Sequence, residues 1–328
     1  MTLILSASQL DSLADMPATI AAVERAFGDM ARGTACQPAP SSLHLASSDA
    51  RFLPMSALAD VEQLAAVKLL SDIPANRNVG LPTQRSTIML VSQITGETLA
   101  ILDGRVPTRV RTAAASAVAT KLLARPRSTT LGLVGAGALA VAHVQAILAV
   151  LPIRDIVVWS RTADTSLKFR QAIEHHGLNV VQAASAEEVV RSADVVCTLT
   201  PATEPVVRGR WFRPGQHFNA VGSRPRPDHR EIDSEGMARA RVFVDSLSTA
   251  IEKSGALIIP VSEGAMSFGD VVAEIGHVAA GAHPGRTGDD EITLFNSVGI
   301  GLQDLAIGRL LYDKALEQGL GTELDLSS

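Results

Sequence analysis

A run of small residues, Gly135-Ala136-Gly137-Ala138-Leu139-Ala140, matches the Gly-x-Gly-x-x-Ala pattern that binds a dinucleotide pyrophosphate. It follows the apolar segment Leu131–Val134 and precedes a helical pattern, which is the context that the motif requires. Gly135 permits a tight turn, Gly137 lets a phosphate approach the backbone, and Ala140 allows close helix–strand packing. Because a helix N-terminus also attracts anions, the sequence predicts a dinucleotide site here.

The end of the next apolar segment, Ile156–Trp159, indicates which dinucleotide is bound. An NAD site usually places Asp or Glu there to bind the ribose hydroxyls, but this chain has Ser160-Arg161-Thr162. A guanidinium and two hydroxyls suit the 2′-phosphate of NADP, so we expect NADPH, with NADH as the alternative. Further cofactor contacts are expected at the ends of later strands, from Thr198, Leu199, Thr200, Val221, Gly222 and Ser223.

Strand and helix patterns alternate from residue 130 onward, which is typical of a parallel sheet. We expect strands at Leu131–Val134, Ile156–Trp159, Leu178–Gln182, Asp194–Leu199, His217–Val221 and Val242–Val244. Helices are expected at Ala138–Val150, near Ser166–His175 and from Ser185. The prediction is an α/β fold in which residues 121–299 form a Rossmann-type, doubly wound NADP-binding domain.

The first 120 residues predict a separate α+β lobe. They are helical at Leu10–Arg32 and favour strands around Ser42–Leu53, Ala65–Leu70 and Thr87–Val91, with a turn at Thr95-Gly96. The helical periodicity of Leu294–Gln318 predicts a helix that packs back on this lobe, which therefore comprises residues 1–120 plus about 300–328. Residues Glu323–Ser328 are expected to fray.

Composition excludes several classes of protein. The chain has 328 residues, 46% hydrophobic and 19% charged, and its net charge of −5 offers no broad cationic surface for nucleic acid. No apolar run approaches the ~20 residues needed to span a bilayer, and no basic segment follows Met1, so we expect a cytoplasmic protein. Cys36 and Cys197 lie far apart and the only close histidine pair is His175-His176, so no metal site is expected.

Several segments, in this order along most of the chain, resemble the ornithine cyclodeaminase and mu-crystallin family. They are Val67-Lys68-Leu69, Arg111–Ala117, the Gly135 fingerprint, Asn219–Ser223 with Arg230–Asp233, and Phe295–Gly299. The mu-crystallin branch is more similar, at Val158–Thr162, Arg224–Glu231 and Leu310–Asp313. The resemblance implies a homodimer built through the N-terminal lobe, which also binds the substrate, with the active site between the lobes.

The resemblance also implies roles for individual residues. Lys68 would contact the substrate carboxylate and polarise or protonate an imine, and Arg111 would hold a carboxylate or the cofactor. Thr83, Thr112 and Ser297 would hold the nicotinamide half or the phosphates. Asp228 resembles an aspartate of the mu-crystallin branch that could relay a proton to the imine nitrogen.

Two segments depart from the family pattern. Residues Ser223–Arg230 are not the Asp-x-Pro-Gly-Lys pattern of the cyclodeaminases, which counts against ornithine cyclisation. Near Ser41–Leu45 the family commonly has an arginine that clamps the substrate carboxylate; here His44 is the candidate replacement, unless Lys68 and Arg111 suffice.

The implied activity is NADPH-dependent reduction of a small cyclic imino acid, either 1-pyrroline-2-carboxylate to L-proline or 1-piperideine-2-carboxylate to L-pipecolate. The sequence leaves the ring size and the direction open. The alternatives are an alanine-type dehydrogenase, which would require free ammonia, and an ornithine cyclodeaminase, which would use NAD catalytically and release ammonia. From another class, a non-catalytic protein that binds NADPH and a small ligand would be stabilised by NADPH without turnover.

Overall fold

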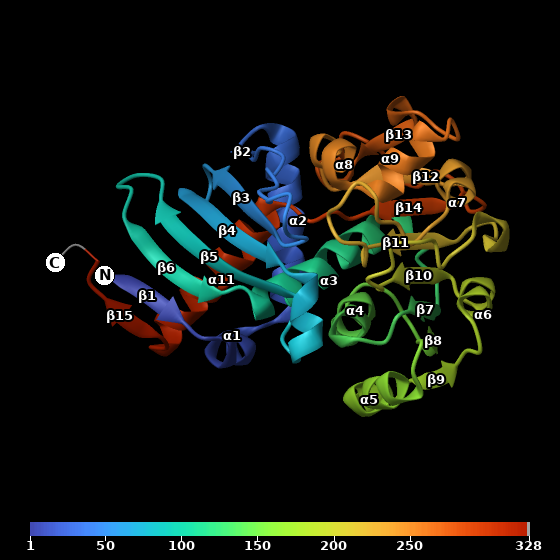
Figure 1. The fold of residues 1–328 in the computed structure, drawn as a ribbon, viewed down its shortest axis with the longest axis horizontal. Helices are drawn as coiled ribbons and strands as arrows, with labels where there is room; N and C mark the ends of the chain where they lie inside the picture. Colours follow the sequence, from blue (N-terminus) through green and yellow to red (C-terminus); the bar gives the residue numbers. More distant parts are fainter. Residues whose placement is uncertain (327–328) are drawn as a thin grey trace. The chain divides into compact units, whose positions relative to one another are not determined.

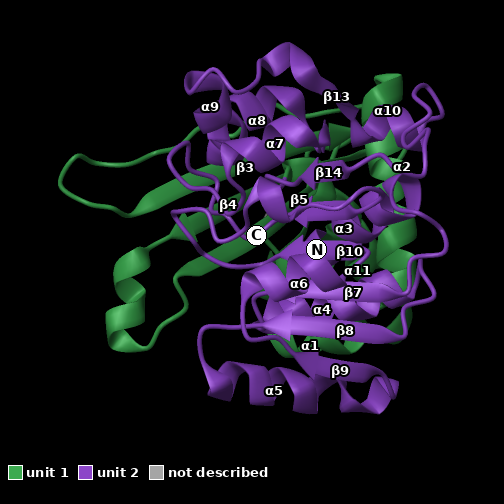
Figure 2. Cartoon of the chain, turned by 90° about the vertical axis from the view of Figure 1, so that its right-hand side faces the viewer, with its two compact units in different colours: residues 1–111, 300–328 green, residues 112–299 purple. Residues whose placement is uncertain are grey.

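The computed structural model describes residues 1–326 and divides into two compact units (Figures 1 and 2). Unit 1 comprises Met1–Arg111 and Ile300 onward, and unit 2 comprises Thr112–Gly299. The division falls within helix α3 (Arg105–Leu123). Within residues 1–326, no helix is both long enough and apolar enough to cross a membrane.

Unit 1 is a mixed sheet covered by helices. Its strands, seven among the described residues, lie in the order β15 (Thr322–Leu324), β1 (Thr2–Leu5), β6 (Thr98–Asp103), β5 (Gln84–Ser92), β4 (Leu64–Asp72), β3 (Arg51–Ala59) and β2 (Ala35–Cys36). Its helices are α1 (Ala7–Leu13), α2 (Met16–Arg32), the 3-10 turn η1 (Pro74–Val79) and α11 (Gly301–Gln318). Helix α11 packs on α2 and on β3, β4 and β5, so one face of the sheet is covered.

Unit 2 is a parallel sheet with the Rossmann strand order. Its eight described strands lie in the order β13 (Val271–Glu274), β12 (Arg241–Val244), β14 (Thr293–Asn296), β11 (His217–Ala220), β10 (Val195–Thr198), β7 (Thr130–Val134), β8 (Asp155–Trp159) and β9 (Asn179–Gln182). The main crossover helices are α4 (Ala138–Leu148), α5 (Ala163–Ile173) and α6 (Ala186–Ser192). The shorter helices are α7 (Ser234–Arg239), α8 (Leu247–Lys253), α9 (Gly255–Ser262) and α10 (Ile275–Ala279). The predicted Rossmann fold is confirmed.

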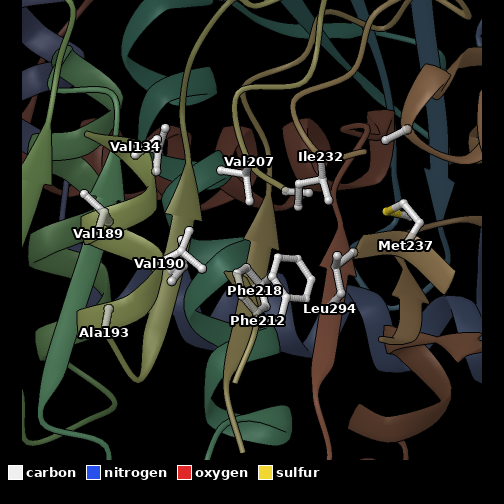
Figure 3. Packing of buried hydrophobic residues seen from close by; sticks show 14 of the residues in the cluster. Val134, Val189, Val190, Ala193, Val207, Phe212, Phe218, Ile232, Met237 and Leu294 are labelled. Atoms are coloured by element: carbon white, nitrogen blue, oxygen red, sulfur yellow. The ribbon is translucent and has the colours of Figure 1, made fainter. Parts of the chain in front are cut away.

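Strand burial explains why this sheet holds its shape. Strands β10, β11 and β14 are buried along their whole length, as expected where helices cover both faces of a parallel sheet. One face packs Val189 and Val190 of α6 with Phe218 of β11 and Leu294 of β14 in a single apolar cluster (Figure 3). A rigid sheet of this kind fixes the loops at its carboxyl ends, where ligands bind.

Four sequence expectations need correction. The helix expected over Leu10–Arg32 is two helices, because Asp15 caps the N-terminus of α2 with Pro17 in its first turn. The helix expected from Leu294 begins only at Gly301. Thr293–Asn296 is instead the buried strand β14, and a short apolar run does not distinguish a buried strand from a helix.

The other two corrections concern strands. Residues expected to favour a strand from Ser42 make only an isolated bridge at Leu43 before β3 begins at Arg51. Glu323 and Leu324, at the start of the segment expected to fray, belong to β15 (Thr322–Leu324), which pairs antiparallel with β1 because β1 offers it an open edge. Residues 327–328 of that segment lie outside the described part of the chain.

Candidate active site

Lys68 lies on β4 with its side chain on the covered face of the unit 1 sheet. Burial alternates along β4, so Val67 and Leu69 are exposed and Lys68 is buried. Its neighbours in register are Met55 of β3 and Ile88 of β5, both buried and apolar. The lysine side chain is 0% exposed, and a lysine so placed needs a charged partner.

That partner is Asp304, in the first turn of α11. Its Oδ2 lies 2.5 Å from Lys68 Nζ, and its Oδ1 accepts a hydrogen bond of 3.0 Å from Arg111 Nε. Arg111 Nη1 donates to Gln303 Oε1 at 2.6 Å. One strand (β4) and two helices (α3 and α11) therefore place two cations and one carboxylate in one buried cluster, which we call the cation cluster (Lys68, Arg111, Gln303 and Asp304).

The cation cluster carries one net positive charge when Lys68 is protonated. Burial, followed by repulsion from Arg111, lowers the pKa of Lys68 to about 8, while Asp304 acts against this shift. Nζ has Asp304 as its one ion-pair partner among the described residues, and Gln303 Nε2 is buried there without an acceptor. A buried cationic group with unused donors is suited to an anionic ligand such as a carboxylate.

The other unit 1 candidates lie apart from this cluster in the hydrogen-bond network. His44 is exposed, in the loop before β3, and Thr83 is half-buried, in the loop before β5, where its carbonyl accepts a hydrogen bond of 2.7 Å from the Ile73 N–H. Within residues 1–326, no hydrogen bond or ion pair joins either side chain to Lys68 or Arg111. Their predicted roles therefore stay predictions.

The glycine fingerprint of unit 2 has the geometry of a dinucleotide turn. Gly135 has a φ of 112°, and a Cβ there would lie 2.8 Å from the Leu199 carbonyl oxygen, so the turn after β7 requires glycine. Gly137 is the N-cap of α4 and has nothing within 4 Å of an added Cβ. Ala140 is fully buried against the sheet. The open space at Gly137, beside an N-terminus without a side-chain cap, fits a pyrophosphate.

Glu231 joins the two neighbouring loops at the carboxyl ends of β10 and β11 by hydrogen bonds. Its carboxylate accepts hydrogen bonds from the Thr198 hydroxyl at 2.8 Å, the Thr200 hydroxyl at 2.7 Å, the Thr200 N–H at 2.6 Å and the Gly222 N–H at 2.7 Å. Burial raises the pKa of Glu231 to about 7, and the four hydrogen bonds oppose that rise. Thr198 is fully buried, so its hydroxyl acts on the site through Glu231.

The remaining contacts expected at this edge lie close to the same loops. Leu199 and Val221 are buried, and Ser297 donates its backbone N–H to the Ala220 carbonyl at 3.0 Å. Ser223 and Ser297 line a common cavity of about 10 Å³. Thr112, in α3, is buried at the start of unit 2.

A larger pocket opens at the carboxyl ends of β8 and β9. Its volume is about 360 Å³, and it is lined by Trp159, Ser160, Ala163, Ser166, Leu167, Arg170, Gln182, Ala183 and Ala184. Arg161 is exposed and is not part of this lining. Thr162 is the N-cap of α5, so its hydroxyl accepts a hydrogen bond from the Thr165 N–H. Within residues 1–326, neither Arg161 nor Arg170 has an ion-pair partner.

Asp228 lies in an exposed loop of unit 2. Its side chain is 71% exposed, and it lies 3.9 Å from His229 Nε2. Its predicted role in proton transfer stays a prediction.

Sequence reasoning missed four residues of these arrangements: Gln303, Asp304, Glu231 and Arg170. Two of them carried a signal: Glu231 lies in the family segment Arg230–Asp233, and Asp304 has a signal in its neighbours. It is an acidic residue on a helix whose neighbours Leu302 and Leu305 are apolar and buried, and a carboxylate among such neighbours needs a cationic partner.

The parallel sheet with its glycine turn and the buried cation cluster define an oxidoreductase that uses a nicotinamide dinucleotide. The ornithine cyclodeaminase/mu-crystallin family matches residues 1–319, and the chain belongs to this family. The resemblance inferred from the sequence is confirmed.

Curated relatives and solved structures agree with this assignment. The Delta(1)-pyrroline-2-carboxylate reductase of Bacillus cereus is 35% identical over 325 residues, 98% of this chain and 99% of the relative. The ketimine reductase mu-crystallin of Mus musculus is 34% identical over 313 residues, 94% of this chain and 96% of the relative.

Two solved structures share the fold over nearly the whole chain. The Delta(1)-pyrroline-2-carboxylate reductase of Thermococcus litoralis, in complex with NADH and L-proline, superposes with a TM-score of 0.94 at 36% identity, covering 98% of this chain and 100% of that chain. An archaeal alanine dehydrogenase dimer with bound NAD has a TM-score of 0.92 at 34% identity, covering 99% of each chain.

Proposed function

We propose that the protein reduces the carbon–nitrogen double bond of small cyclic imino acids, converting 1-pyrroline-2-carboxylate to L-proline with NAD(P)H. The six-membered homologue, 1-piperideine-2-carboxylate, is a second expected substrate. The observation that carries this proposal is the cation cluster, in which the buried Lys68 ammonium and Arg111 guanidinium share the single carboxylate of Asp304 and leave a net positive charge. The activities of the Bacillus cereus, mouse and Thermococcus litoralis relatives support it.

In this proposal the two units have separate tasks. Unit 1 holds the substrate, because Arg111 and Lys68 supply the positive charge for its carboxylate. Unit 2 holds the dinucleotide at Gly135–Ala140 and at the two loops, after β10 and β11, that are hydrogen-bonded to Glu231. When bound, the nicotinamide supplies the hydride. Lys68 donates the proton to the imine nitrogen, because its ammonium lies in the same cluster as the Arg111 guanidinium that is proposed to hold the substrate carboxylate.

A substrate panel tests the activity. Purified protein is mixed with each cyclic imino acid and either NADPH or NADH, and oxidation of the cofactor is followed by absorbance. Turnover without ammonia supports imine reduction. Turnover of pyruvate only with ammonia would support the alanine dehydrogenase alternative, which the archaeal structure favours. Ornithine consumption with release of ammonia would support a cyclodeaminase, and stabilisation by NADPH without any turnover would support a binding protein.

NADPH is the proposed physiological cofactor. The end of β8 carries Ser160-Arg161-Thr162 in place of a carboxylate, and the carboxylate in the first turn of α5, Asp164, pairs with Lys168 at 2.8 Å. Arg161 and Arg170 are both exposed, which leaves their guanidinium groups accessible to a 2′-phosphate.

Arg161→Ala is expected to raise the KM for NADPH about 10-fold or more, since a charge-assisted hydrogen bond contributes about 1.5–3 kcal/mol. The KM for NADH, which lacks the 2′-phosphate, should change less than about 2-fold. Steady-state kinetics with both cofactors measure this difference. The control is Arg154→Ala, because Arg154 is an exposed arginine just before the same strand. An equal rise for both cofactors would contradict NADPH selection by Arg161.

We propose that the protein is a homodimer whose interface lies on unit 1. The uncovered face of its sheet exposes a patch of apolar side chains: Phe52, Leu58, Val67, Leu69 and Met89. These residues lie on the adjacent strands β3, β4 and β5, and contiguous apolar surface of this kind is typical of an interface. The archaeal alanine dehydrogenase that shares this fold is a dimer.

Leu69→Glu is expected to shift the protein from dimer to monomer, because a buried interface would have to desolvate the new carboxylate. Sedimentation velocity at micromolar concentration measures the mass. The matched control is Leu316→Glu, since Leu316 is 53% exposed on helix α11. A wild-type monomer, or a variant that stays dimeric, would place the interface elsewhere or remove it.

A further inference from the structure

The carboxylate of Asp304 lies at the centre of the cation cluster. One oxygen faces Lys68 Nζ at 2.5 Å and the other accepts from Arg111 Nε at 3.0 Å. The side chains of Lys68, Asp304 and Arg111 are 0%, 1% and 6% exposed, so solvent screens these interactions very little.

The fold fixes this carboxylate in place. Helix α11 begins at Gly301, where an added Cβ would lie 2.7 Å from the Ser56 carbonyl oxygen of β3, so the start of the helix is pressed against the sheet. Asp304 lies in the first turn, where the helix dipole stabilises a negative charge. Gln303 accepts a hydrogen bond from Arg111, which orients the guanidinium beside Asp304.

We propose that Asp304 is a positioning residue of the imine reduction, whose carboxylate keeps the Lys68 ammonium protonated and directed so that Lys68 can donate its proton to the substrate nitrogen. This inference rests on the proposed function. An N–H bond of the ammonium breaks as an N–H bond forms at the imine nitrogen, and the hydride comes from NAD(P)H. The neutral amine of Lys68 then regains a proton from water.

Lys68 depends on Asp304 because, within residues 1–326, Asp304 is the group that favours the charged form. The flanking strands present Met55 and Ile88, which carry no charge. Helix α3 presents Arg111, whose positive charge lowers the pKa of Lys68, as does burial. Asp304 of α11 raises that pKa, and the balance places it at about 8. Removing the carboxylate should therefore release the proton at a lower pH.

The test compares the pH dependence of kcat/KM in wild type and in Asp304→Asn. Wild-type activity should fall as the pH rises through about 8, because the proton donor is lost. In Asp304→Asn this alkaline limb should move to lower pH by at least about one unit, a shift that a merely structural role would not produce. The matched control is Asp313→Asn, which removes a half-buried carboxylate from the same helix, where Asp313 pairs with Arg309.

Two further variants keep the proposal open to refutation. In Lys68→Arg, the residual kcat/KM should no longer fall as the pH rises through about 8, because a guanidinium stays protonated throughout this pH range. Asp304→Ser removes the charge with a smaller side chain, in case the asparagine variant does not fold. NADPH binding, followed by fluorescence, and circular dichroism report the fold of each variant.

The outcomes separate this inference from the proposed function. If wild type consumes no cofactor with any cyclic imino acid, the proposed function fails. If wild type is active and a folded Asp304 variant keeps the alkaline limb of wild type, only the positioning role is overturned. Unfolding of both Asp304 variants would assign the residue to the stability of unit 1 and would also overturn it.

Discussion

Lys68→Met is expected to lower kcat/KM for imine reduction by about 10²–10⁴-fold, the usual contribution of a positioned proton donor. Methionine has a similar length and suits the apolar neighbours Met55 and Ile88, so the variant should fold. Asp304 keeps its hydrogen bond from Arg111, which prevents an isolated buried charge. The affinity for NADPH, which is proposed to bind to unit 2, should be unchanged.

Stopped-flow and steady-state measurements with 1-pyrroline-2-carboxylate check this expectation, with NADPH fluorescence as the test of cofactor binding. Lys121→Met, at an exposed position of α3, is the matched control. Turnover within about 10-fold of wild type would remove Lys68 from proton transfer and reopen the role of Asp228. Loss of NADPH binding together with turnover would indicate a structural defect.

Gly137→Asp is the second substitution with a large expected effect, here on the cofactor. An added Cβ at Gly137 meets nothing within 4 Å, so the side chain fits the folded protein. Its carboxylate would occupy the space at the α4 N-terminus proposed for the pyrophosphate and would repel it. Two like charges about 4 Å apart repel by about 1 kcal/mol in water and about 4 kcal/mol near a protein surface, so the Kd for NADPH should rise about 5- to 1,000-fold.

Fluorescence titration and thermal unfolding together measure this prediction. The unfolding midpoint without cofactor should stay close to that of wild type. Gly269→Asp, at an exposed position with only ordinary contacts, is the control for the added charge. Gly135→Ala should behave in the opposite way and destabilise the fold, because Gly135 has a positive φ and no room for a Cβ. Unchanged NADPH affinity in Gly137→Asp would exclude pyrophosphate binding at this turn.

The nucleotide-binding unit was predictable because its signals are local. A strand, a glycine turn and a helix occur within Leu131–Leu148, so the fingerprint and its context could be read together. Strand β14 was not recognised, because Thr293–Asn296 is buried on all sides and has no alternation that separates a strand from the start of a helix. The corrected sheet inserts this strand between β11 and β12.

The candidate active site was only partly predictable. Lys68 and Arg111 could be carried over from a family resemblance, but their partner Asp304 lies 193 residues beyond Arg111 in the chain. The apolar neighbours of Asp304 indicate that it needs a cationic partner, but nothing in local composition identifies a partner so far away in the chain. Glu231 was quoted as part of a motif, but its four hydrogen bonds to two other loops depend on how the strands are ordered in the sheet.

The sequence by itself determined the class of this protein: its Rossmann unit, its dinucleotide turn and its family membership, all of which depend on short motifs and their order. The tertiary structure decided how the charges are arranged. Whether a lysine in an apolar strand reaches solvent or is buried depends on what packs over it, and here helix α11 closes over Lys68 and supplies Asp304. The protonation of a buried group depends on such neighbours, so the chemistry of Lys68 follows from the fold of unit 1.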